Sequence, residues 1–184
     1  MKHLLHAALA LVVLMASSCG AAATETTEPS LLPPHERDDL ATLFDPMVSP
    51  LGYKVTRGSL VDRSTYEVDA DGGHLAIYLA PTADISTDQF ANDFVAIVRT
   101  FLPFVFEQWP NLNSFDVCQE PFESTDETPP SLTIIDLTRD AAAEIAWSEL
   151  DLAGIIALNE RPGISVFART AVRDSATWRQ ATEG

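Results

Sequence analysis

The stretch STDQFANDFVAIVRTFLPFVF, residues 86–106, decides how the rest of the chain must fold. Ser86 and Gln89 form a capping-box pattern, in which the serine side chain accepts a hydrogen bond from a backbone N–H of the first helical turn. The apolar residues that follow recur every three or four positions and place one stripe on a single helix face. The stripe consists of Phe90, Phe94, Ile97, Val98, Phe101 and Val105. The pattern predicts a long helix at the centre of the core.

The end of this helix is apolar on all sides. Residues 101–106 contain four apolar side chains besides Phe101 and Pro103, so we expect a kink at Pro103 and contacts on more than one face. The pair Trp109-Pro110 ends the helix. Helical spacing assigns most of the aromatic side chains to the core, and Phe104 and Phe106 are the best candidates for lining a pocket or a groove for a partner.

A β-hairpin is predicted before the long helix. Residues 53–69 and 74–80 have strand character, and the turn residues Asp71-Gly72-Gly73 separate them. Within 74–80 alternate residues point to opposite faces. Leu75, Ile77 and Leu79 therefore share the core face, whereas His74 and Tyr78 lie on the other face.

The remaining segments complete an α+β pattern. Residues 40–51 have helical periodicity, although Pro46 and Pro50 should break or kink the second half. The other expected elements are strands at 115–119, 131–137 and 164–169, helices at 138–147 and 150–158, and a last turn capped by Asp174 or Ser175. We expect an antiparallel sheet of about four to five strands, with helices packed mainly on one face, in a single domain spanning residues 34–184.

The first 19 residues have the layout of an export signal. A short basic start precedes the apolar stretch 4–15, and the small residues 16–18 follow it. This stretch is shorter than the roughly 20 residues of a spanning helix and matches the core of a signal peptide. We expect residues 1–18 to be a signal peptide.

The motif ASSC at residues 16–19 resembles the lipobox of bacterial lipoproteins. The resemblance implies that Cys19 is lipidated and becomes the first residue of an envelope protein, with residues 19–33 as a flexible tether to the membrane. The alternative is ordinary cleavage after Ala23, at the AAA site of residues 21–23, which would release a secreted protein.

Composition excludes one class of partner. The chain carries 11 Lys and Arg against 27 Asp and Glu, a formal charge of −16. Nucleic-acid binding needs clustered basic residues, and here they are scattered singly. The expected partners are the membrane, through the lipid on Cys19, and an envelope protein or small-molecule ligand. We expect no nucleic acid.

Catalytic motifs are not visible in the sequence. It has no HExxH, GxSxG, Walker or GxGxxG motif. Cys118 lies among apolar strand residues and is expected to be buried and unreactive. No catalytic residue, metal ligand or cofactor is predicted, and the ligand-binding residues stay unknown. The prediction is a binding or interaction domain.

The alternative hypothesis is an exported hydrolase, and it would depend on carboxylates. Residues 67–72 match the opening of a calcium loop, but its twelfth position is Tyr78 instead of glutamate. The acidic residues of 116–127 are interpreted as a solvated surface: Asp116, Glu120, Glu123, Asp126 and Glu127. A hydrolase would have to gather Asp69, Asp71 or Glu120, with His35 or His74, around a metal.

His74 is expected to have a structural role. We expect its imidazole to hydrogen-bond the turn carboxylates or the backbone, and His74→Gln to cost about 1 kcal/mol.

Overall fold

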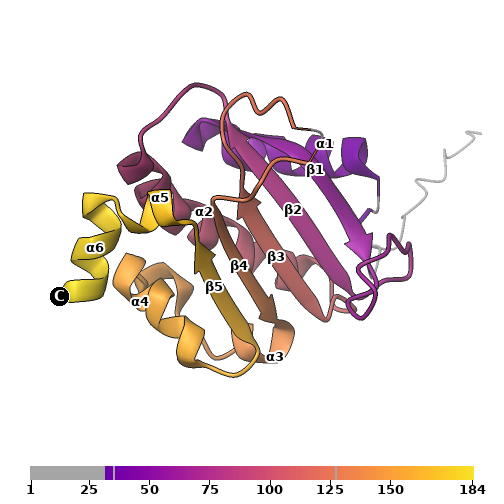
Figure 1. The fold of residues 1–184 in the computed structure, drawn as a ribbon. Coiled ribbons are helices and arrows are strands. Elements are labelled where there is room, and N and C mark those ends of the chain that lie inside the picture. The colour runs from indigo at the N-terminus through magenta and orange to yellow at the C-terminus, as the bar shows by residue number, and fades with distance from the viewer. Residues whose placement is uncertain (1–31, 35, 127) are drawn as a thin grey trace, which may run out of the picture.

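The computed structural model describes residues 32–34, 36–126 and 128–184. It contains a five-stranded sheet in the order β1-β2-β3-β4-β5, with helices behind it (Figure 1). The strands are β1 (Tyr53–Val61), β2 (His74–Pro81), β3 (Ser114–Gln119), β4 (Thr133–Thr138) and β5 (Ile164–Ala168). The α+β class is confirmed. The signal peptide and the lipobox, with Cys19, lie outside the described residues.

The sheet is mixed, because β2 and β3 are parallel while the other neighbouring pairs are antiparallel. The long helix α2 (Thr87–Gln108) carries the chain back along the sheet between β2 and β3, and such a crossover is what a parallel pair requires. The expectation of an antiparallel sheet is therefore corrected at this one pair.

The core lies between the sheet and the helices α1 (Arg37–Val48) and α2. The stripe predicted on α2 is buried in full, and Ser86 caps the helix by accepting a hydrogen bond from the Gln89 N–H. Phe44 of α1 packs on Phe101 and Trp109, with ring centroids 5.0 and 5.9 Å apart. Each fully buried aromatic or large aliphatic side chain contributes about 1.5–3 kcal/mol.

The helix α2 ends at Gln108, just before Trp109-Pro110 as predicted, and neither Pro46 nor Pro103 interrupts the helix that contains it. Pro46 lies in the last turn of α1, which ends at Val48, and α2 continues past Pro103 to Gln108. The smaller helical elements are η1 (Ser49–Leu51), α3 (Arg139–Ala142), η2 (Trp147–Glu149), α4 (Leu152–Ala157), η3 (Leu158–Glu160), α5 (Thr170–Arg173) and α6 (Ala176–Glu183).

The first hairpin strand is shorter than predicted. β1 ends at Val61, and residues 62–73 form a loop instead of a tight turn. The Asp62 carboxylate ends the strand because it accepts hydrogen bonds from the Ser64 and Thr65 N–H groups, which closes a local turn. Gly72 fits only without a side chain, since a Cβ there would lie 2.4 Å from the Val61 carbonyl oxygen.

Helical side chains occupy both edges of the sheet. On β1, Asp45 accepts a 2.7 Å hydrogen bond from the Val55 N–H, and Arg37 Nε donates to the Thr56 carbonyl at 2.9 Å. On β5, Asn159 of η3 accepts from the Val166 N–H at 2.9 Å. Backbone groups that would otherwise pair with another strand are thus engaged at each edge.

Candidate binding site

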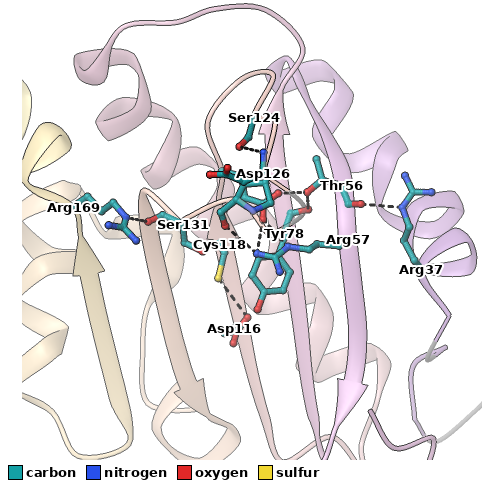
Figure 2. A network of polar contacts seen from close by, with 12 residues as sticks. Arg37, Thr56, Arg57, Tyr78, Asp116, Cys118, Ser124, Asp126, Ser131 and Arg169 are labelled. Atoms are coloured by element: carbon teal, nitrogen blue, oxygen red, sulfur yellow. Dashed lines mark hydrogen bonds and ion pairs between the residues drawn. The ribbon is translucent and has the colours of Figure 1, made fainter. Parts of the chain in front are cut away.

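A β-bulge in β1 brings two side chains together on the sheet face that the helices leave open. The register shifts between Val55, which pairs with Leu79, and Arg57, which pairs with Tyr78, so Thr56 is the extra residue. A bulge re-aims side chains and is frequent next to functional sites. Figure 2 shows the Thr56 and Arg57 side chains on β1. Both form hydrogen bonds with Glu120.

Glu120 is a buried carboxylate whose charge is compensated. It follows the last residue of β3, and its side chain is 1% exposed. Arg57 Nε and Nη2 each lie 2.7 Å from its Oε1, while the Thr56 hydroxyl donates to its Oε2 at 2.5 Å. Removing one partner of a buried ion pair leaves a charge without compensation, at a cost of about 3–5 kcal/mol for a fully buried pair. Arg57 is one-third exposed, so the cost is smaller here.

The Arg57 guanidinium is held in place on its other sides. Its carbon lies 3.7 Å from the centroid of the Tyr78 ring, and its Nη2 donates to the Pro129 carbonyl at 3.2 Å. Burial, with the nearby charge of Asp116, raises the pKa of Tyr78 to about 12. Tyr78 therefore stays neutral at physiological pH and offers its ring face to a cation.

A pocket of about 490 Å³ opens above this ion pair. It lies beyond the carboxyl ends of β2 and β3, the place where open α/β sheets bind ligands next to parallel strands. Residues 120–124, Asp126 and Pro129, from the segment after β3, form one part of the lining. The rest of the lining consists of Lys54, Thr56, Arg57 and residues 80–82, from β1 and the end of β2. Its volume falls within the range of about 300–1,000 Å³ that small-molecule sites occupy.

His74 lies on the open face as predicted, but its partners differ from those expected. It is fully buried, and its two nitrogens lie 2.9 Å from Ser114 Oγ and 3.1 Å from Asp116 Oδ2. Both partners belong to β3, because parallel pairing sets His74 opposite Ser114. The turn carboxylates Asp69 and Asp71 are not its hydrogen-bond partners.

The Ser114, His74 and Asp116 side chains contain the groups of a serine hydrolase triad without its geometry. In such a triad the histidine Nε2 faces the serine and Nδ1 faces the aspartate, and the serine is open to substrate. Here Nδ1 faces Ser114 and Nε2 faces Asp116, and Ser114 is 1% exposed. The arrangement holds β2 and β3 together.

The nearby pair Arg63 and Asp136 extends the polar face toward β4. Arg63 Nη2 lies 3.1 and 3.0 Å from the two carboxylate oxygens of Asp136. Burial raises the pKa of Asp136, and the charge of Arg63 opposes that rise.

Cys118 is buried as predicted, at 2% exposure. It lies on the open face of the sheet, and its thiol is 3.7 Å from Asp116 Oδ1. Burial and the Asp116 carboxylate raise the pKa of the thiol, so it is a poor nucleophile.

The carboxylates proposed for a hydrolase are not gathered. Glu120 bonds the Leu79 carbonyl through its backbone N–H, at the opposite end of β2 from Asp69 and Asp71. No group of three or more His, Cys, Asp and Glu side chains in the described ranges is placed to hold a metal ion. His35 and Glu127 lie outside those ranges. The interpretation of the acidic segment as solvated is wrong for Glu120 and for Asp116, whose side chain is 14% exposed and contacts His74. It holds for the exposed residues Glu123 and Asp126.

The two phenylalanines singled out at the end of α2 differ in surroundings. Phe104 is partly buried and packs edge-on against Phe44 and Trp109 of the core. Phe106 borders a smaller pocket of about 290 Å³, beside the Arg139 guanidinium.

Sequence reasoning did not find Lys54, Thr56 or Arg57 as site residues. Lys54 offered a signal, because it is the only lysine after Lys2. Thr56 and Arg57 offered none, since a bulge has no fixed sequence signature.

Comparison with known proteins places the chain in no family: no family model, curated protein or solved structure matches it. None of the helices in the described ranges is both long and apolar enough to cross a membrane.

Proposed function

We propose that the protein is an envelope lipoprotein, anchored through Cys19, whose domain binds a small ligand outside the cytoplasmic membrane. The observation that carries the binding function is the pocket beyond β2 and β3, whose floor is the buried Glu120 with Arg57 and Thr56. A buried ion pair adds little stability over an apolar replacement, so its position under a pocket favours a role in recognition.

The anchor is tested by metabolic labelling with an alkyne fatty acid. The full chain should incorporate the label and fractionate with membranes, and Cys19→Ala should lose both properties. Equal labelling of the two forms would reject the anchor. Release of soluble protein beginning at Thr24 would support cleavage after Ala23 instead.

The binding function is tested by thermal unfolding with a panel of ligand classes: amino acids, dipeptides, sugars, nucleotides and polyamines. At least one class should raise the unfolding midpoint, because a ligand that binds only the folded state stabilises it. Ser124→Trp, which places a large ring in the pocket wall, should remove that rise. A panel in which no class stabilises the protein would contradict the proposal.

A further inference from the structure

The pocket has a cationic side and an anionic side. The strand β1 contributes Lys54 and Arg57, whereas the segment after β3 contributes Glu123 and Asp126. Among the lining residues that the structure describes, the Arg57–Glu120 contact is the one ion pair. The charges of Lys54, Glu123 and Asp126 thus face one cavity without neutralising one another. An occupant that carries both signs of charge would complement them.

The cationic side has hydrogen-bond donors that are not used within the described part of the protein. Arg57 uses Nε and Nη2 for Glu120 and the Pro129 carbonyl, while its Nη1 forms no hydrogen bond with any residue in the described part of the chain. The exposed Lys54 lies three positions earlier on β1, and both residues pair with residues of the open face of β2, Ala80 and Tyr78. A carboxylate in the pocket could therefore accept hydrogen bonds from both side chains while Glu120 stays paired.

The anionic side belongs to the segment that follows β3. Glu123 and Asp126 are exposed, and the Asp126 backbone is held by the Ser124 hydroxyl, which accepts its N–H at 3.2 Å. Two carboxylates suit a primary ammonium group, because ammonium offers three donors.

We propose that this pocket binds a small zwitterion, an amino acid or a dipeptide, with its carboxylate on Lys54 and Arg57 and its ammonium on Glu123 and Asp126. The assignment rests on the proposed binding function and names its ligand class. Hydrogen bonds to charged groups are the strong ones, which makes both ends of the ligand determinants of affinity.

The first experiment is calorimetric titration of the full chain in mild detergent. L-Alanine or L-alanyl-L-alanine should bind saturably. N-acetyl-L-alanyl-L-alanine lacks the ammonium and L-alanyl-L-alaninamide lacks the carboxylate, so each should bind at least about tenfold more weakly than the dipeptide. Equal affinity for the dipeptide and both derivatives, or no binding of either zwitterion, would overturn the proposal.

Variants assign the two ends of the ligand. Lys54→Gln should weaken binding of the zwitterion about tenfold, and Lys54→Arg, which keeps the charge, should restore most of the affinity. The double variant Glu123→Gln/Asp126→Asn should weaken it similarly. Glu160→Gln removes an exposed carboxylate on η3, away from the pocket, and serves as the matched control. Wild-type affinity in the Lys54→Gln and double variants would reject the site.

A lipid headgroup is the competing source of a zwitterion near a membrane. Glycerophosphoethanolamine carries an ammonium and a phosphate, so tighter binding of this compound than of the dipeptide would overturn the amino-acid assignment. Rejection of the zwitterion as ligand can be distinguished from rejection of the binding function. If only sugars or nucleotides stabilise the protein in the ligand panel, the protein binds a ligand but the zwitterion assignment is wrong.

Discussion

A single arginine completes the end of the longest helix. The last turn of α2 has no basic residue of its own, and Arg139 from α3 donates to the carbonyls of Phe106, Trp109 and Leu112. Carbonyls at a helix end need such partners, and a cation there interacts favourably with the helix dipole.

We expect Arg139→Lys to lower the free energy of unfolding by about 1–3 kcal/mol, because an ammonium cannot reproduce the planar fork of donors. Urea denaturation measures the change. Arg161→Lys is the matched control: the Arg161–Glu144 pair is exposed, so its loss should cost less than about 1 kcal/mol. Equal effects of the two substitutions would contradict the role of Arg139.

Cys118 should resist alkylation in the folded protein. Its raised pKa keeps the thiol protonated and its burial keeps reagents away. Iodoacetamide at mildly alkaline pH should leave the peptide containing Cys118 unmodified in native protein and modify it in concentrated guanidinium, as mass spectrometry will show. Alkylation of native protein at the unfolded rate would indicate an open site.

At the scale of elements, a carboxylate joins the first turn of α2 to α6. Asp88 accepts a 2.7 Å hydrogen bond from the Thr177 N–H, and this bond lowers the pKa of Asp88. The folded state therefore holds fewer protons than the unfolded state around the ordinary aspartate pKa of about 3.9. The stabilisation is complete above that value and is lost as the pH falls through the lowered folded pKa.

Acid should accordingly loosen α6 in wild-type protein. Trp178 of α6 stacks on Phe94, with centroids 6.2 Å apart, so its fluorescence reports the docking. We expect the wild-type advantage over Asp88→Asn to shrink as the pH falls below about 4. Asp140→Asn, at an exposed aspartate in the first turn of α3, should show no comparable convergence with wild type.

The elements that the sequence predicted are those with local signals. The Ser86 cap and the stripe on α2 depend on neighbours in the chain, and the structure confirms them. In β2, Leu75, Ile77 and Leu79 belong to the core as predicted, but His74, Ala76 and Ala80 on the other face are buried as well. The pocket floor joins Arg57 to Glu120 across 63 positions. That pair depends on the register of β1 and on the parallel placement of β3, which no local pattern specifies.

At the scale of the whole molecule, the formal charge of −16 should make stability depend on salt. Like charges on the folded domain repel, and salt screens surface charges more than about 10 Å apart at 0.1 M. We expect the thermal midpoint to rise by a few degrees between about 10 and 150 mM sodium chloride. A midpoint that falls instead would mean that ion pairs such as Arg57–Glu120 outweigh the repulsion.

Because Thr56 is the extra residue of a bulge, it can be removed without changing which residues of β1 face the core. Deleting Thr56 would leave Val55 facing the core and Arg57 facing outward, so both halves of β1 would keep their faces. Deleting Ser59, which lies in the regular part of β1, would instead turn the side chains on one side of the deletion to the opposite face of the sheet. In a scan of single deletions along β1, the protein that lacks Thr56 should therefore fold. It should lose the hydrogen bond from the threonine to Glu120. In evolutionary terms, the insertion of a single codon into a regular strand would create this part of the pocket.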